Sequence, residues 1–184
     1  MKFNILTIFP EIFNVFNYGV ISKAFENNLS INCYDIRENA INKHGQIDGK
    51  PYGGGEGMLM MAQPLKETLS TISSKDRGHV IYLSPQGKRL SQENVINYSS
   101  MKSLTLVCGR YEGVDQRFID KYVDEEISIA DIIISGGELA ALILIDAISR
   151  NIENVVGNKN SVSNDTFSNN LLKGQIGRAH VWTP

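Results

Sequence analysis

The residues that first suggest chemistry are the glycines of "PYGGGEGMLMM", at positions 51 to 61. Glycine has no Cβ, so such a run permits positive φ angles and lets a base, a cofactor or another backbone approach closely. A flexible linker is the alternative, but linkers are usually rich in Gly and Ser with polar flanks, whereas a Tyr and an apolar run enclose this stretch. The pattern therefore favours a binding loop.

Three further turns of special residues each follow an apolar stretch. They are "SPQG" at 84–87, "GRYEG" at 109–113 and "SGGE" at 135–138. In open α/β sheets, ligands bind beyond the carboxyl ends of the strands, so we expect three such turns to converge on one crevice. Ordinary turn chemistry explains each turn taken alone, and only their recurrence indicates a single cofactor pocket.

Several other chemistries lack their sequence patterns. No G-x-G-x-x-G follows a strand, "QGKR" is not a P-loop, and no G-x-S-x-G elbow is present. Cys33 and Cys108 are isolated and the three histidines are scattered, so neither a disulfide framework nor zinc-ligand spacing occurs. A dinucleotide-binding fold, a P-loop enzyme and a zinc site are therefore not expected.

The elements that must position these turns alternate along the chain. Apolar runs predict strands at 2–9, 29–36, 79–84, 104–109 and 125–135. Helical spacing predicts helices at 10–28, 63–72 and 91–98, after the "GRYEG" turn, and in the apolar stretch 136–152. Alternation of this kind predicts an α/β domain with a mostly parallel sheet flanked by helices.

The composition indicates a soluble protein of the cytoplasm. A chain of 184 residues with 42% hydrophobic residues can form one domain with a substantial core. Its N-terminus is not a signal peptide, and the apolar run 139–148 is too short to span a bilayer. The net charge of -2 gives no bulk attraction to nucleic acid, so contact with RNA would need a local basic patch.

Longer motifs give the chain a family resemblance. They are "PYGGGEGMLM" (51–60), "YLSPQGK" (82–88), "LVCGRYEGVDQR" (106–117), "DEEISIADIIISGGELA" (124–140) and "DTF" (165–167). Taken in order from residue 1 to about residue 172, the chain resembles the bacterial tRNA (guanine-N1)-methyltransferases, which belong to the SPOUT class of knotted methyltransferases.

The resemblance implies a deep C-terminal trefoil knot, bound S-adenosyl-L-methionine and an obligate homodimer. Carried over residue by residue, the cofactor contacts are Tyr82, Leu83, Ser84, Pro85, Gln86, Gly109, Tyr111, Glu112, Gly113, Ile129, Ala130, Asp131, Ile132, Ile133, Ile134, Ser135, Gly136 and Gly137. These residues include the three turns described above.

Two departures fall within this set, at Ala130 and Ile132. Where the family usually has Ser-Ile-Gly-Asp-Tyr, this chain has Ser128, Ile129, Ala130, Asp131 and Ile132. A positive φ at the glycine position would strain Ala130, whereas a position that serves only close approach could tolerate one methyl group. Cofactor affinity is the property that these departures affect.

The implied substrate is the guanine immediately 3′ of the tRNA anticodon, whose N1 must lose a proton before it can attack the methyl group. Asp165 matches the family's catalytic aspartate and would accept that proton, while Arg150 would stabilise charge on the guanine oxygen. In the family this aspartate reaches the cofactor of the other subunit. Without the resemblance, Asp165 is interpreted as an N-cap or loop carboxylate. Arg150 is then interpreted as a cation that interacts with the dipole at a helix C-terminus.

The glycine loop then borders the cofactor and target-base pocket near the dimer interface, and the methionines pack it into the core. The substrate contacts implied are Tyr52, Gly53, Gly54 and Gly55, with His44, Asp48 and Arg110 as weaker candidates. Taken alone, a histidine such as His44 is more often an ordinary polar loop residue. A magnesium requirement fits the resemblance, although no metal ligand is assigned.

The resemblance also divides the chain. We expect a SPOUT methyltransferase domain at 1–158, a linker carrying the catalytic aspartate at 159–173, and a non-native tail at 174–184 that resembles a translated sequencing adapter. Relatives continue into a helical tRNA-binding domain, so we expect a truncated fragment that binds tRNA weakly.

Two other readings stay open. The first is another SPOUT methyltransferase that modifies rRNA or a different tRNA base. The second is a non-catalytic RNA-binding or assembly protein that keeps the knot as a scaffold and binds no cofactor.

Overall fold

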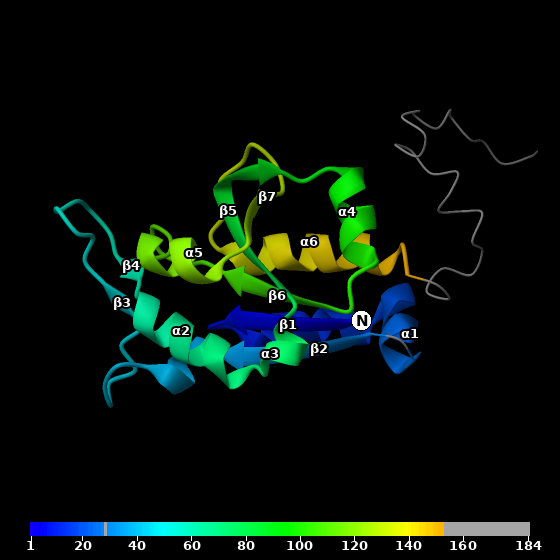
Figure 1. The fold of residues 1–184 in the computed structure, drawn as a ribbon, viewed down its shortest axis with the longest axis horizontal. Coiled ribbons are helices and arrows are strands. Elements are labelled where there is room, and N and C mark those ends of the chain that lie inside the picture. The colour runs from blue at the N-terminus through cyan, green and yellow to red at the C-terminus, as the bar shows by residue number, and fades with distance from the viewer. Residues whose placement is uncertain (28, 153–184) are drawn as a thin grey trace, which may run out of the picture.

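The computed structural model describes residues 1–27 and 29–152, and its centre is a five-stranded sheet with strand order β2-β1-β6-β5-β7 (Figure 1). Every neighbouring pair in this sheet is parallel. The strands are β1 (Lys2–Thr7), β2 (Ser30–Asp35), β5 (His79–Arg89), β6 (Ser103–Cys108) and β7 (Glu125–Ser128). The short strands β3 (Asp48–Gly49) and β4 (Leu59–Met60) form a separate antiparallel pair. The predicted α/β class is confirmed.

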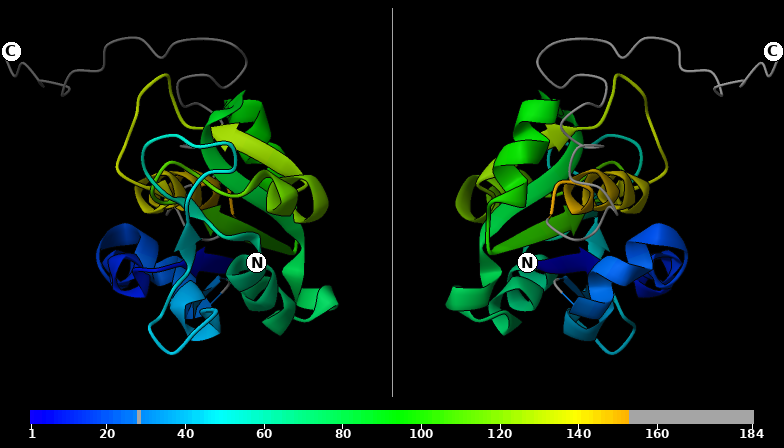
Figure 2. Two further views of the ribbon diagram at one scale, coloured as in Figure 1. Left: turned by 90° about the vertical axis from the view of Figure 1, so that its left-hand side faces the viewer. Right: turned by 90° about the vertical axis from the view of Figure 1, so that its right-hand side faces the viewer.

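Helices cover both faces of the sheet. They are the 3-10 helices η1 (Pro10–Asn17) and η2 (Ile36–Asn39) and the α-helices α1 (Gly19–Asn27), α2 (Ala62–Thr71), α3 (Ser74–Arg77), α4 (Gln92–Ser99), α5 (Gln116–Tyr122) and α6 (Gly137–Ser149). Figure 2 shows α1 and α6 on one side of the sheet and α2 and α5 on the other.

The central strand β1 explains why both faces must be covered. Phe3 and Ile5 belong to the core cluster that includes Leu144 of α6, whereas Leu6 belongs to the cluster that includes Phe118 of α5. Successive side chains point to opposite faces of a strand, so a strand buried on both faces is apolar almost throughout. All but the first residue of β1 are buried.

Two predicted helix and strand boundaries are wrong at the N-terminal and C-terminal ends of the domain. The single helix expected at 10–28 is split, because Tyr18 is extended and Gly19 has φ +76° between η1 and α1. The strand expected at 125–135 ends at Ser128, after which residues 129–136 form irregular structure. A row of isoleucines predicts a strand, but these residues run irregularly from the end of β7 to the start of α6, which lies against the end of β6.

The strand β5 does not end in a turn at Ser84 as predicted. It continues to Arg89, but its pairing with β7 shifts, so that Ile127 lies opposite both Leu83 and Lys88. Residues 84–87 therefore leave the regular ladder at the place where the turn was expected. The strand resumes beyond them because Lys88 and Arg89 pair again with β7.

Within the described ranges, no helix has the length and hydropathy needed to cross a membrane.

Candidate functional site

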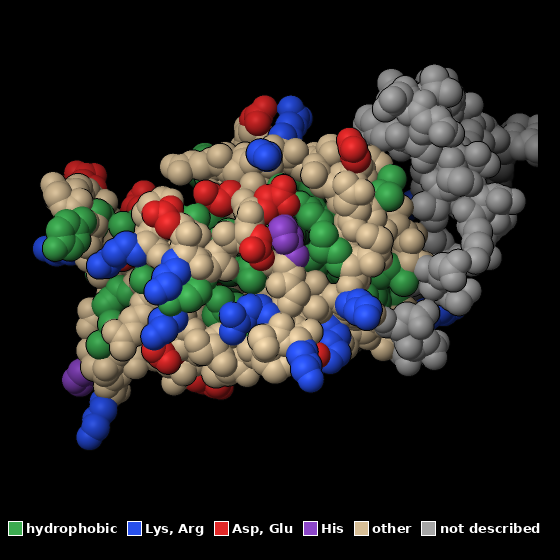
Figure 3. All heavy atoms as spheres, in the orientation of Figure 1, with side chains coloured by type: hydrophobic (Ala, Val, Ile, Leu, Met, Phe, Trp, Pro, Cys, Tyr) green, Lys and Arg blue, Asp and Glu red, His purple; other side chains and the backbone are tan. Residues whose placement is uncertain are grey.

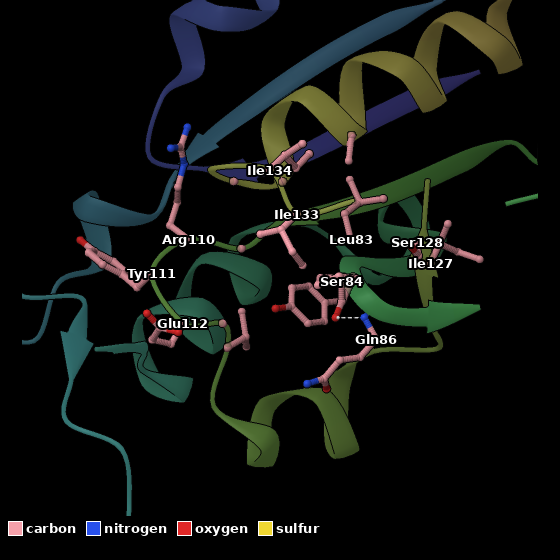
Figure 4. Close-up of a pocket in the computed structure, with 18 of the residues that line it drawn as sticks. Leu83, Ser84, Gln86, Arg110, Tyr111, Glu112, Ile127, Ser128, Ile133 and Ile134 are labelled. Carbon is pink, nitrogen blue, oxygen red and sulfur yellow. Dashed lines mark hydrogen bonds between the residues drawn. The ribbon is translucent and has the colours of Figure 1, made fainter. Parts of the chain in front are cut away.

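A cavity of about 460 Å³ lies at the carboxyl ends of β5, β6 and β7 (Figure 4). It lies within the volume range typical of small-molecule sites. Its lining residues are Leu59, Tyr82–Gln86, Gly109–Val114, Gln116, Ile119, Ile127–Ile129, Ile132–Gly137 and Ala140. The three turns singled out in the sequence therefore meet in one pocket. All the predicted cofactor contacts line it except Ala130 and Asp131.

The first wall is the bulged part of β5. Tyr82 is buried, and that burial, reinforced by the Glu126 carboxylate, raises the pKa of its phenol. Beyond it, the Gln86 amide donates to Ser84 Oγ at 3.2 Å, which folds the segment back on itself (Figure 4). A Cβ on Gly109 would come within 2.8 Å of the Tyr82 ring, so the aromatic side chain and the glycine of the next strand fit each other.

The second wall is the turn after β6. Tyr111 has φ +59°, and it is the only non-glycine residue with positive φ in the part of the chain that the structure describes. The turn is tied to the end of the glycine loop, because the Glu112 amide donates to Met58 O and the Met60 amide donates to Gly113 O, both at 2.9 Å. Met60 is fully buried, as predicted for the residues that follow the glycines.

The third wall is the irregular segment that leads into α6. Gly137 donates its amide to Gly109 O at 2.8 Å, and a Cβ at Gly137 would lie 2.7 Å from the Cα of Cys108. Helix α6 can therefore begin directly against β6 only with glycine at this position. Ile132 and Ile133 are 57% and 84% exposed at the mouth of the cavity.

The substitution at Ala130 does not strain the backbone. Ala130 is not among the residues with positive φ, and its carbonyl accepts a 2.8 Å hydrogen bond from Ser128 Oγ. Neither Ala130 nor Asp131 lines the cavity of the single chain, so their contact with the cofactor stays a prediction. Asp131 points to solvent, where its carboxylate lies 3.4 Å from the Arg89 guanidinium.

An ion pair between the partly buried Arg110 and the fully buried Glu138 lies behind the second and third walls. Arg110 Nε donates to Glu138 Oε2 at 2.8 Å, and Thr7 Oγ1 donates to Glu138 Oε1 at 2.8 Å. Glu138 was not predicted as a functional residue, although it closes the "SGGE" turn. The sequence predicted the turn that contains Glu138, but it could not predict that Glu138 pairs with Arg110, because the two residues lie 28 positions apart.

The tip of the glycine loop does not border the pocket in the single chain. Tyr52 is 99% exposed, and a Cβ on Gly53, Gly54 or Gly55 would meet nothing within 4 Å. These glycines have φ of +87°, +87° and +128°, which confirms that the loop needs their conformational freedom. Only its downstream end reaches the cavity, where a Cβ at Gly57 would touch Glu112.

The other predicted substrate residues are dispersed. Arg110 lines the pocket, but His44 is exposed in a loop where its amide donates to Asn42 Oδ1. Asp48 lies outside the cavity, although close enough to Tyr111 that its charge adds to burial in raising the pKa of that phenol. Neither His44 nor Asp48 lines the pocket in one copy of the chain.

Of the two predicted catalytic residues, only Arg150 is among the described residues, and it does not line this pocket. Arg150 follows the last residue of α6, whose first residue lies at the cavity. At about 1.5 Å per residue, a helix of this length separates its ends by roughly 20 Å. Asp165 lies outside the described residues.

The described residues contain no cluster of three or more His, Cys, Asp or Glu side chains that could hold a metal ion. The pocket instead offers apolar side chains, glycine backbone and a few polar groups. Such a site is suited to bind a small molecule with an apolar, planar part through backbone groups.

Comparisons with known proteins all find tRNA (guanine-N1)-methyltransferases. The family described as tRNA (guanine-1)-methyltransferase TrmD matches residues 1–182. The tRNA (guanine-N(1)-)-methyltransferase of Clostridium kluyveri is 44% identical over 174 residues, which cover 94% of this chain and 71% of the relative. That of Finegoldia magna is 48% identical over 175 residues, which cover 94% and 75%. The crystal structure of the tRNA (m1G37) methyltransferase from Aquifex aeolicus has a TM-score of 0.78 at 38% identity, covering 86% of this chain and 72% of that one.

Proposed function

Because this chain belongs to the tRNA (guanine-1)-methyltransferase family, we propose that it transfers the methyl group of S-adenosyl-L-methionine to N1 of guanosine 37 in tRNA, 3′ of the anticodon. The observation that carries the proposal is the pocket in which the three turns predicted to hold the cofactor converge.

The residues that line the pocket fit this cofactor. Isoleucine side chains and glycine backbone provide a narrow apolar surface for an adenine ring, with backbone groups available to its polar edge. Glu112 supplies a carboxylate in the same cavity, which suits a ligand that carries positive charge. The cofactor brings an activated methyl group on its sulfonium, so the protein has to position the guanine and remove its N1 proton.

Proton removal falls to Asp165 and charge stabilisation to Arg150. A carboxylate is a suitable base for this proton, and a guanidinium can stabilise the negative charge that develops on the guanine oxygen. Because Arg150 lies at the far end of α6 from the pocket, we propose that these residues serve the pocket of a second copy, in a homodimer. Leu139 and Ile143, each about half exposed on α6, support an interface there.

The SPOUT class and its trefoil knot belong to the same proposal. Two features support a threaded arrangement: the segment 129–136 runs irregularly from the end of β7 to the start of α6, and Gly137 is pressed against Cys108. Connections in proteins normally avoid threading, so a close backbone approach of this kind calls for glycine.

The RNA partner is supported by charge distribution. On the face shown in Figure 3, Lys and Arg side chains spread over α2, α3 and α5. Exposed members of this group are Lys66, Lys75, Arg117 and Lys121. Since the whole chain has a formal net charge of -2, these side chains are the positive charges on this face that could attract phosphates.

Several finer predictions remain. They are target-base contacts from His44, Asp48, Arg110 and the Tyr52–Gly55 loop tip, a location in the cytoplasm, a magnesium requirement and weakened tRNA binding by this chain. The division at residues 158 and 173 also stays a prediction, since both positions lie outside the described residues.

The test uses this chain with S-adenosylmethionine labelled on its methyl group. The substrate is a tRNA transcript with guanosine at position 37, and a transcript with adenosine there is the control. We expect N1-methylguanosine only in the first transcript, identified by mass spectrometry of nucleosides. The variant Asp165→Asn should lower the rate about 10²- to 10⁴-fold and leave the cofactor dissociation constant unchanged, because it removes only the base. Glu67→Gln, which changes a half-exposed carboxylate on α2, is the matched control.

The outcomes separate the alternatives. Methylation at another base or in rRNA would indicate a different SPOUT methyltransferase. A folded chain that binds no S-adenosylmethionine would support the scaffold reading and contradict the proposed activity.

A further inference from the structure

Glu138 is a carboxylate with no exposed surface, and it lies directly behind the pocket as the second residue of α6. Burying an ionised carboxylate is costly unless it is paired and hydrogen-bonded. Here both oxygens have partners, Arg110 Nε on one and Thr7 Oγ1 on the other, each at 2.8 Å. Because Glu138 does not line the cavity, ligand contact does not account for this arrangement.

Arg110 carries the effect of Glu138 to the pocket. Its backbone belongs to the second wall, and its Nη1 donates to the carbonyl of Ser135 in the third wall at 3.1 Å. Figure 4 shows the Arg110 side chain directed away from Ser84 and Gln86, so the guanidinium lies behind the cavity. The side chain thus joins two walls that face the same ligand.

The backbone of the third wall is packed closely on this guanidinium. A Cβ added at Gly136 would lie 2.3 Å from Arg110 Nε, a distance that no real side chain could keep without displacing Arg110. The guanidinium carbon also lies 4.6 Å from the centre of the Phe9 ring, and the Phe9 amide donates to Thr7 Oγ1 at 3.0 Å. The end of β1 therefore provides a fixed support for Arg110 and Glu138.

The walls themselves contain few anchoring side chains. Gly109, Gly113, Gly136 and Gly137 make up much of their backbone, and glycine adds conformational freedom that a bound state must remove. A binding site gains affinity when such freedom is removed before the ligand arrives.

We propose that Glu138 is a positioning residue for the cofactor: it holds Arg110 so that the guanidinium fixes the spacing between the 109–113 turn and the 132–137 segment. The proposal rests on the proposed function, since it takes the pocket to be the S-adenosylmethionine site. A role in stability alone is the competing explanation.

The experiment measures S-adenosylmethionine binding by calorimetry to the 184-residue chain and two variants. Glu138→Gln keeps the shape and loses the charge, whereas Arg110→Lys keeps the charge and loses the second arm toward Ser135. Binding is measured well below each variant's unfolding midpoint, so that only folded protein is compared. Glu93→Gln and Arg37→Lys, which remove the same groups at exposed positions distant from the pocket, are the matched controls.

We expect Glu138→Gln to raise the dissociation constant at least tenfold, Arg110→Lys at least fivefold, and each control less than twofold. The dissociation constant of the double variant should stay within threefold of that of the weaker-binding single variant, because both changes break the same link. A stability role alone would lower the unfolding midpoint and leave the dissociation constant of folded protein unchanged.

Three results would overturn the inference. The first is that Glu138→Gln folds and binds S-adenosylmethionine with a dissociation constant within threefold of that of the unmodified chain. The second is that Arg110→Lys has a dissociation constant within threefold of that of the unmodified chain. This result overturns the inference even if Glu138→Gln does not fold. The third is an unmodified chain that binds no cofactor, which removes the proposed function and this inference together, whereas the first two leave the proposed function intact.

Discussion

At the scale of single residues, the pocket depends on glycines that lie against neighbouring backbone. At Gly137 the space for a Cβ is occupied by Cys108 Cα at 2.7 Å and Gly109 N at 2.9 Å. Backbone cannot rotate away as a side chain can, so even one methyl group would have to push α6 away from β6.

We therefore predict that Gly137→Ala lowers the free energy of unfolding by about 1–3 kcal/mol, the usual cost of overpacking. Urea denaturation at neutral pH measures it. The matched control is Gly49→Ala, where the added Cβ would meet only Met61 atoms at 3.5 Å or more and φ is not positive. Equal stability of the two variants would contradict the close approach at Gly137.

Some residues of the site could be predicted from the sequence and others could not. The glycines and the turn residues at strand ends were found because their types require a special backbone or close approach. The pairing of Arg110 with Glu138 was not found, since it depends on which turns the fold brings together. Ile119 and Ala140 were missed for a related reason, because they read as ordinary positions on helical faces.

At the scale of elements, α5 starts immediately after the second wall of the pocket. Asp115 is its N-cap and accepts a hydrogen bond from the Arg117 amide at 3.0 Å. The Arg117 side chain bonded to it lowers the pKa of this carboxyl. The cap therefore contributes to where the turn 109–113 ends.

We predict that Asp115→Ala lowers the free energy of unfolding by about 1 kcal/mol at pH 7, as loss of a helix cap does. The folded-state pKa is depressed, so the stabilisation by the charged cap is complete above the ordinary value of about 3.9 and is lost as pH falls below it. Urea unfolding at pH 7, 5 and 3.5 should show the same gap between variant and unmodified chain at the first two and a smaller gap at the last. A gap that stays constant to pH 3.5 would mean that the carboxylate charge has no part in the cap.

Elements with strong periodicity were predicted well, and those near the pocket were not. Helices α2, α4 and α6 begin within two residues of the predicted positions, because apolar spacing and caps such as Ser91 define them locally. The isoleucines after Ser128 resemble a strand in composition, but they run irregularly from the end of β7 to the start of α6 without pairing in register with a neighbour among the described residues. Tertiary contacts override local preference at such positions.

At the scale of the whole molecule, the proposed homodimer can be tested on α6. Ile143 is 51% exposed on this helix, four residues after the similarly exposed Leu139, so both lie on one face. An interface here would bury an apolar surface that water covers in the single chain.

We predict that Ile143→Glu converts a dimer into a monomer, because burying an unpaired charge opposes association. Sedimentation equilibrium measures the mass in solution. Ile96→Glu on α4 is the matched control, since Ile96 is 52% exposed and lies outside the proposed interface. The dimer surface must be placed elsewhere if both variants stay dimeric. An unmodified chain that is already a monomer would contradict the homodimer itself.

The contact between Arg110 and Phe9 has a further consequence for the whole molecule. Phe9 is 39% exposed beside η1, while the guanidinium on its ring joins two walls of the pocket. A second copy that covered Phe9 would restrict the same guanidinium that the cofactor needs in place. Binding of the cofactor and association of two chains would then be thermodynamically linked, and each would strengthen the other by the same factor.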